Sequence, residues 1–304
     1  MEAPGGLWIA LTVWAAFAQT LRNTVQRSLT ASLGTLGATL VRFLYGLPFA
    51  LAWLACVHLW RAEPVPALGW AFLGWVTLGA VAQIAGTAFL LLAMEARSFA
   101  LGVAYSKTEL LQIAVFGLAF LGDPVTLPVA LAVACGTLGV LLLSPADPRR
   151  PFAALLTGLT TRPALLGLAS GAGFAFAAVG YRGAALALDG SFLMRAATAL
   201  AAAQFIQTFL LGGWLLWKTP RVVADTLHLW RPSLFAGLMG AAASAGWFSA
   251  FALQPASHVR TLGLIELVFS YAVSRKLFRE SLSWLELAGM AFLAAGIAVI
   301  TLSG

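Results

Sequence analysis

Long apolar runs fill almost the whole chain, and they constrain its fold more than any motif does. A helix that crosses a bilayer needs about 20 mostly apolar residues. The sequence contains ten such segments, at residues 6–27, 33–60, 67–94, 99–121, 126–144, 164–182, 191–217, 232–253, 258–278 and 283–302. Of its 304 residues, 61% are hydrophobic and only 10% are charged, whereas soluble domains carry about 25% charged residues. The sequence therefore predicts an all-α integral membrane protein with ten transmembrane helices.

One long polar interruption lies near the middle of the chain. It is rich in prolines and arginines, namely Pro145, Pro148, Pro151 and Pro163 with Arg149, Arg150 and Arg162. Proline cannot continue a helix, so this composition favours a linker. We expect a first group of five helices at 1–144, a linker at 145–163 and a second group of five helices at 164–304.

The charged residues, cysteines and histidines argue against several classes of function. The formal net charge of +7 comes from basic residues scattered between the apolar runs, which is typical of membrane topology and not of nucleic-acid binding. Cys56 and Cys135 lie inside apolar runs, and the three histidines are far apart, so no metal-ligand spacing exists. We expect no metal and no cofactor. The sequence also lacks a Ser/His arrangement and the GxSxG and HExxH motifs, so we do not expect an enzyme.

The two groups of helices repeat one pattern of acidic residues and glycines. An offset of 157 residues sets three pairs over one another, and an offset of 153 sets a fourth pair in the second helix of each group. The pairs are Glu109 with Glu266, Asp123 with Glu280, Gly139 with Gly296 and, at the second offset, Arg42 with Arg195. Two consecutive groups with an odd number of helices must have opposite orientations. The pattern predicts two inverted five-helix repeats, an architecture of transporters whose substrate site lies near the bilayer midplane.

At these repeated positions the chain resembles the drug/metabolite transporter superfamily, in its EamA-like ten-helix branch. The resemblance covers nearly the whole chain and implies a secondary transporter, often an exporter, of amino acids, other metabolites or drugs. The four repeated pairs match the family's arginine in the second helix, its acidic position in the fourth helix, the acidic residue of the turn that follows and the glycine of the last helix. The family usually has proline directly after the fourth-helix acidic residue, where this chain has Leu110 and Leu267. The kink is therefore expected to be missing or to be made in another way.

The ionisable residues inside the spans are the first candidates for function, because such residues are costly in lipid and usually face an interior. Glu109 and Glu266 could couple transport to a proton or bind a substrate ammonium. Alternatively, Arg42 or Arg195 neutralises them, and we expect these arginines to form gating or structural ion pairs. Lys107 is two positions from Glu109 and does not share its helix face, so we expect it to hold another carboxylate or a substrate carboxylate.

Polar and aromatic residues inside the spans are the second set of candidates. We expect six of them to line a central cavity together with Glu109 and Glu266: Trp14, Asn23, Gln83, Tyr105, Gln112 and Trp247. The polar face of the first helix could instead bond to neighbouring helices, and both readings stay open. Tryptophans at helix ends, such as Trp60, Trp217 and Trp230, are better explained as anchors at the membrane interface.

We therefore expect a multi-pass protein of the bacterial inner (plasma) membrane that carries a small molecule by alternating access, with a proton as a candidate coupling ion. The first apolar segment lacks the flanks of a signal peptide and is expected to remain as a helix. The partners would be the substrate and membrane lipid, and the chain would act as a monomer or a homodimer. A channel and a non-transporting receptor or scaffold are the alternatives. Basic loop residues place both termini outside, whereas the family resemblance implies cytoplasmic termini, so the orientation stays open.

Overall fold

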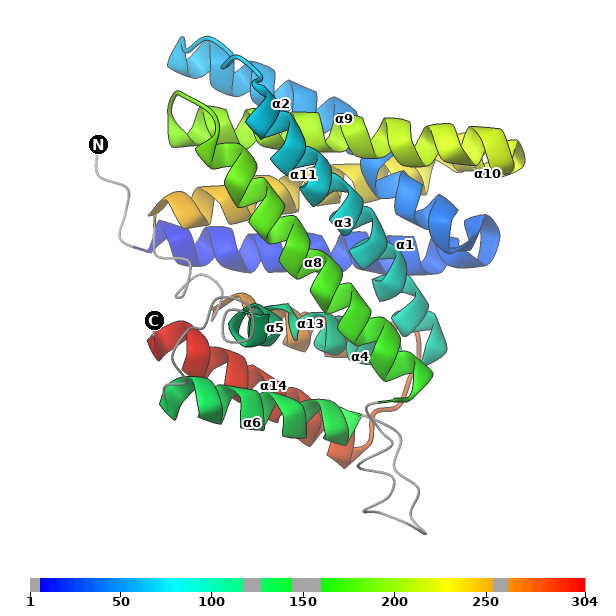
Figure 1. Ribbon diagram of the computed structural model, residues 1–304. Helices are drawn as coiled ribbons and strands as arrows, with labels where there is room; N and C mark the ends of the chain where they lie inside the picture. The colour runs from blue at the N-terminus through cyan, green and yellow to red at the C-terminus, as the bar shows by residue number, and fades with distance from the viewer. Residues whose placement is uncertain (1–5, 117–126, 144–159, 254–261, 304) are drawn as a thin grey trace. The chain divides into compact units, whose positions relative to one another are not determined.

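The structure is a computed structural model that describes residues 6–116, 127–143, 160–253 and 262–303 (Figure 1). Every regular element in these ranges is an α-helix. The helices are α1 Leu7–Leu44, α2 Leu47–Arg61, α3 Trp70–Ala96, α4 Phe99–Ser106, α5 Glu109–Phe116, α6 Leu127–Leu143, α8 Arg162–Leu186, α9 Phe192–Lys218, α10 Pro220–His228, α11 Trp230–Leu253, α13 Ile265–Lys276 and α14 Trp284–Ser303. The all-α prediction is confirmed for this part of the chain.

Several of these helices suit a protein that is embedded in a membrane. Within the described ranges, four stretches are long and apolar enough to cross a bilayer, and these are Leu7–Arg61, Trp70–Ala96, Arg162–Leu186 and Leu193–Lys218. The first of them runs through α1 and α2 and is far longer than the roughly 20 residues that one crossing needs.

The helices form two compact units, and each unit combines segments from both halves of the chain. The first unit comprises residues 1–88 and 176–255, and the second comprises residues 89–175 and 256–304. The long helices α3 and α8 each contribute one part to each unit. The compact units therefore differ from the predicted repeats, which describe the order of helices along the chain and not their grouping in space. Most of the predicted linker, residues 144–159, lies outside the described residues.

The first helix is longer than the sequence predicts, because polar residues near its expected end remain helical. The hydroxyls of Ser28 and Thr30 donate hydrogen bonds to the carbonyls of Val25 and Arg27 at 2.8 and 2.9 Å, so small polar side chains bond within their own helix. The interruption falls at Gly34, where φ is +65° and ψ is 172°. Glycine adopts a positive φ without steric cost, and α1 changes direction along its length in Figure 1.

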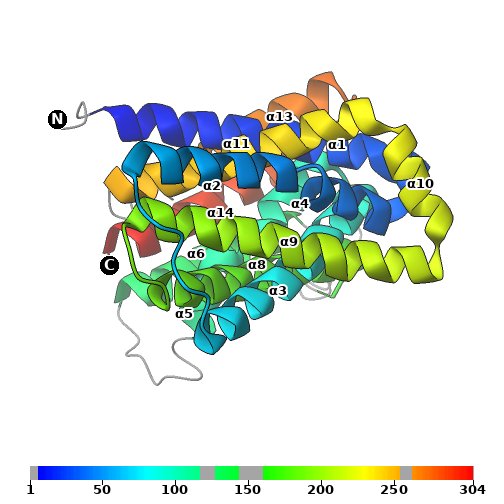
Figure 2. The ribbon, with the colours of Figure 1, turned by 90° about the horizontal axis from the view of Figure 1, so that it is seen from above.

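Small residues let the helices of the first unit approach one another closely. α1 packs along α11, and α2 lies beside α9 (Figure 2). A Cβ added at Gly246 of α11 would lie 3.0 Å from the Cβ of Ala15 in α1. A Cβ added at Gly180 of α8 would lie 2.6 Å from the backbone nitrogen of Gly79 in α3. Lipid is as apolar as the helix surfaces, so close packing of this kind must supply much of the attraction between helices.

The second unit contains a glycine contact that occurs twice between the same two helices, α6 and α14, which lie side by side (Figure 1). A Cβ added at Gly139 of α6 would lie 2.9 Å from the carbonyl oxygen of Gly289 in α14. A Cβ added at Gly296 of α14 would lie 2.7 Å from the carbonyl oxygen of Ala132 in α6. The offset of 157 that relates Gly139 to Gly296 also relates Ala132 to Gly289. Exchanging the two helices therefore turns one contact into the other.

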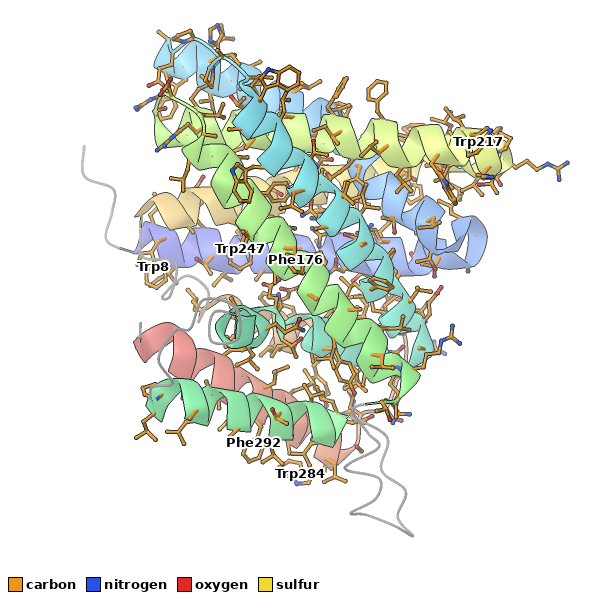
Figure 3. All side chains as sticks on the ribbon, in the orientation of Figure 1. Trp8, Phe176, Trp217, Trp247, Trp284 and Phe292 are labelled. Atoms are coloured by element: carbon orange, nitrogen blue, oxygen red, sulfur yellow. The ribbon has the colours of Figure 1, made fainter. Side chains whose placement is uncertain are left out.

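Tryptophans near helix ends have largely exposed rings. Trp217 near the end of α9 and Trp284 at the start of α14 expose 75% and 79% of their surface (Figure 3). The ammonium of Lys218 lies 4.0 Å from the centre of the Trp217 ring. An aromatic ring beside a basic side chain suits the level of the lipid head groups, which agrees with the interface role expected for Trp217.

The close approach of α6 and α14 predicts that Gly139→Ala destabilises the protein. The added methyl group would meet backbone atoms of Leu293 and Gly289, which cannot rotate away. We expect the free energy of unfolding to fall by about 1–3 kcal/mol, measured by thermal unfolding of the purified protein in detergent. Gly74→Ala in α3 is the matched control, since nothing lies within 4 Å of the added atom. Equal melting temperatures for the two variants would contradict the close contact.

Candidate functional site

The helix predicted at 99–121 is interrupted by Lys107 and Thr108. α4 ends at Ser106, and α5 begins at Glu109. Thr108 donates two hydrogen bonds to the carbonyl of Tyr105, from its hydroxyl at 2.7 Å and from its backbone N–H at 3.1 Å. Bonds of this kind compete with the regular helical pattern. The break places Lys107 at the end of one short helix and Glu109 in the first turn of the next.

The helix that carries Glu266 is interrupted at the equivalent position. Residues 262 and 263 are helical, Leu264 lies in a turn, and α13 begins with the next residue. The offset of 157 sets Leu264 over Lys107, so each break comes two residues ahead of a repeated acidic residue. The chain thus interrupts both helices without the proline that the family resemblance places after the acidic residue, and the interruption lies before that residue instead.

A buried ion pair joins these two interrupted helices within the second unit. The ammonium of Lys107 donates a hydrogen bond to the carboxylate of Glu266. The Glu266 side chain is 1% exposed, and that of Lys107 is 16% exposed. The positive charge lies at the C-terminal end of α4 and the negative charge lies in the first turn of α13, so each helix dipole stabilises its own charge. The carboxylate partner expected for Lys107 is therefore Glu266, and the pair neutralises Glu266 with a lysine where the sequence suggested an arginine.

Two glycines at the start of α8 allow that helix to pack directly on the break between α4 and α5. A Cβ added at Gly167 would collide with Tyr105, and one added at Gly171 would lie 2.6 Å from the hydroxyl oxygen of Thr108. Gln112 of α5 donates hydrogen bonds to that hydroxyl at 2.9 Å and to the carbonyl of Leu168 at 3.0 Å. The GxxxG pattern of α8 thus brings Tyr105 and Gln112, two of the predicted site residues, together with the break.

The acidic residue of the turn after α13 has a structural role. Glu280 accepts hydrogen bonds from the backbone N–H of Phe99, at 2.9 Å, and from the hydroxyl of Ser274. It therefore ties the start of α4 to the end of α13. Its counterpart in the first repeat, Asp123, lies outside the described residues. A second ion pair, Arg97 to Glu286 at 2.7 Å, lies at the starts of α4 and α14 with 42% of the Arg97 side chain exposed.

In the first unit, Gln83 belongs to a hydrogen-bonded cluster from three helices. The side-chain oxygen of Gln83 in α3 accepts hydrogen bonds from the hydroxyl of Tyr181 in α8 and from the amide of Gln207 in α9, both at 2.8 Å. The Gln207 amide also lies within bonding distance of the Tyr181 hydroxyl at 3.0 Å. Sequence reasoning found only Gln83, because about 100 residues or more separate it from its two partners.

The two repeated arginines have different surroundings. Arg42 is buried and donates a hydrogen bond to the hydroxyl of Thr87 at 3.0 Å, which joins α1 to α3. Ser244 is the equivalent of Thr87 at the offset of 157, but its hydroxyl bonds to the carbonyl of Gly240 in its own helix at 3.0 Å. The Nε of Arg195 is buried and has no hydrogen-bond partner among the described residues. The bond of Arg42 is to a neutral hydroxyl, and the gating or structural ion pairs expected of Arg42 and Arg195 stay predictions.

The remaining predicted site residues lie on α1 and α11. Asn23 is buried and accepts a hydrogen bond from Arg22 at 2.8 Å. The indole N–H of Trp247 donates to the side-chain oxygen of Gln19 at 3.2 Å, so part of the polar face of α1 bonds to a neighbouring helix. Trp14 keeps 45% of its surface exposed and lies against Phe17. A cavity lined by these side chains stays a prediction.

The described residues contain no group of three or more His, Cys, Asp or Glu side chains that could hold a metal ion. The polar groups instead gather in pairs and triads between helices. At the Lys107–Glu266 pair the arrangement holds one cation against one anion.

Comparison with known proteins bears on the fold alone. Neither a protein-family model nor a curated protein matches the chain. Among solved structures, the chain is similar to a protein known from a crystal structure, with 18% identity, a TM-score of 0.60 and coverage of 97% of this chain and 98% of that chain. At that identity the likeness shows a shared fold over nearly the whole length.

The burial of the Lys107–Glu266 pair predicts an asymmetry between single and double substitutions. Lys107→Gln leaves a buried carboxylate without its cation and should lower the free energy of unfolding by about 3–5 kcal/mol, whereas the double variant Lys107→Gln/Glu266→Gln should lose much less. Thermal unfolding in detergent measures both. Arg97→Gln is the control, with an expected loss of about 0–1 kcal/mol because this arginine is partly exposed. A double variant as unstable as the single one would contradict the prediction.

Proposed function

We propose that the protein is a secondary transporter of small molecules, of the EamA-like drug/metabolite type, which works by alternating access of two inverted repeats. One observation carries the proposal: a partly buried lysine and a buried glutamate form an ion pair where two helices are interrupted. Ionisable groups among membrane helices usually mark substrate or ion pathways. Interrupted helices are the usual binding elements of secondary transporters.

The internal contacts support the repeat. The offset of 157 relates the two breaks, and it also exchanges the two glycine contacts of α6 and α14. Helices at equivalent places in the two halves pack on each other, namely α2 with α9, α4 with α13 and α6 with α14. The first helix of one half packs on the third helix of the other, as α1 does on α11 and α8 does on α3. Within each unit, exchanging the two halves of the chain maps the pairings of that unit onto themselves.

In this proposal the chain crosses a bacterial inner membrane ten times. Gly34 divides α1 into a first pass and part of a second that continues as α2. α4 and α5 together form the fourth pass, and α13 with the residues ahead of it forms the ninth. α10 is a short connecting helix. Glu266 and Lys107 would hold the substrate or a coupling proton, with Glu109 two residues after Lys107 at the break between α4 and α5.

Reconstituted protein should show saturable uptake and counterflow of a labelled small metabolite in liposomes. The panel should hold amino acids, amines and nucleosides. We expect Glu266→Gln to lower the flux at least tenfold, because the carboxylate at the break is lost, while Arg97→Gln keeps normal flux. Flux that does not saturate would instead favour a channel. Normal flux in correctly folded Glu109→Gln and Glu266→Gln proteins at every pH would rule out a coupling role for both residues.

A further inference from the structure

Arg42 brings a positive charge into the interior of the first unit, and no carboxylate among the described residues pairs with it. Only 8% of its surface is exposed. Its guanidinium donates a hydrogen bond to the hydroxyl of Thr87 at 3.0 Å and lies 5.6 Å from the centre of the neighbouring Phe43 ring. The hydroxyl of Tyr181 lies near enough for an electrostatic interaction. All three of these groups are uncharged.

A buried cation without an anion is costly, because the protein interior does not replace the water that the charge has lost. A guanidinium carries five N–H donors, and the Thr87 hydroxyl accepts from one of its nitrogens. Arg42 lies in the last turn of α1, where the helix dipole favours a cation only weakly. The surroundings of Arg42 therefore lack one negative charge.

The neutral side chains nearby offer hydrogens and lack an acceptor. The hydroxyl oxygen of Thr87 accepts from Arg42, while its own O–H has no acceptor in the part of the chain that the structure describes. Gln83 lies four residues before Thr87, so the two share one face of α3. Its side-chain oxygen already accepts from Tyr181 and Gln207. The group can thus donate to a further partner, and that partner has to be an acceptor.

We infer that Arg42 and Thr87 form the binding site for one small monovalent anion of about the size of chloride, which neutralises the guanidinium and accepts from its free N–H groups and from the Thr87 hydroxyl. The site shares no residue with the Lys107–Glu266 pair and goes beyond the proposed transport function.

The charge and the crowding of the site select this class of anion. One guanidinium needs one negative charge, and a divalent anion would leave an uncompensated charge of the opposite sign. The hydrogen bonds that link Arg42 to Thr87 and Gln83 to Tyr181 are 3.0 and 2.8 Å long, so these side chains already touch and leave no room for a bulky ligand. The small exposed fraction of Arg42 gives an ion of this size access to the guanidinium.

The repeat provides this site once. The offset of 157 sets Ser244 over Thr87 and Gly240 over Gln83, and the Ser244 hydroxyl donates to the Gly240 carbonyl in its own helix. Arg195, the counterpart of Arg42, is only partly buried, so water can compensate part of its charge. One chain should therefore bind one anion.

Thermal-shift titrations of the purified full chain in detergent test the inference. Sodium chloride replaces sodium gluconate stepwise, so that the sodium concentration and the ionic strength stay constant. A ligand that binds only the folded state raises the melting temperature. We expect a saturating rise with chloride, and a rise with bromide or nitrate, relative to the larger gluconate. Radioactive chloride should bind to the purified protein with a stoichiometry of one ion per chain.

The variants should separate the charge from the hydroxyl. Arg42→Gln should abolish the chloride response, because no buried charge then needs an anion, and Arg42→Lys should keep a weaker response because a lysine is a point charge with three donors. Thr87→Val should weaken chloride several-fold. Arg61→Gln is the control, since it removes a positive charge from an exposed position and should match the native protein. If Arg42→Gln does not fold, Thr87→Val and the binding of radioactive chloride still decide the question.

Three results would overturn the inference. The first is a native protein with the same melting temperature in chloride and in gluconate and no bound radioactive chloride. The second is a chloride response that persists in Arg42→Gln or is undiminished in Thr87→Val, because the rise would then be a general effect of the salt. The third is a rise with added phosphatidylglycerol but none with chloride, which would assign the missing negative charge to a lipid phosphate.

Discussion

Close contact between helix backbones is the constraint on which the rest of this structure depends. In lipid, burying apolar surface between helices gives no hydrophobic driving force. The helices must therefore pack on each other more closely than lipid chains can pack on them. The chain meets this demand with glycine and alanine at helix crossings, such as Gly180 on Gly79, Gly246 on Ala15 and Gly139 on Gly289. These crossings fix the distances between helices. They also leave room for a few long polar side chains to reach from one helix to another.

The polar groups of the second unit show how such a scaffold carries charge. α8 packs against the break between α4 and α5 because Gly167 and Gly171 have no side chains. The break in turn holds Lys107 at the end of α4, within reach of Glu266. The ion pair therefore depends on uncharged residues as well as on the two charged ones. Gly167 and Gly171 let α8 pack on the break, and Thr108 forms part of the break itself.

The sequence predicted the helical class and most helix positions from residue types alone, because long apolar runs have few explanations. It also singled out Glu266 as an intramembrane charge, and the functional role of that residue stays a prediction. It did not predict that the first stretch of α1 continues past residue 27 to Gly34, since Ser28 and Thr30 look like loop residues but bond within their own helix. It also could not name the partners of Gln83 and Glu266. Those partners depend on which helices pack together, and the pairing of helices is set by contacts between residues far apart in the chain. The spacing of Gly167 and Gly171 was visible, but its relation to the break needed the structure.

The packing of α1 on α11 has a consequence for how the protein is made. Arg22 of α1 is buried, and its side chain lies against Gly240 of α11. α11 begins at Trp230, so close to 190 residues must be synthesised after α1 ends before its partner exists. At about 5–20 residues per second, this takes about 10–40 s. During that interval the arginine has to be kept from the lipid core, by the insertion machinery or by a position near the bilayer surface. The packing of α1 against α11 is therefore a late step of assembly, although α1 is synthesised first.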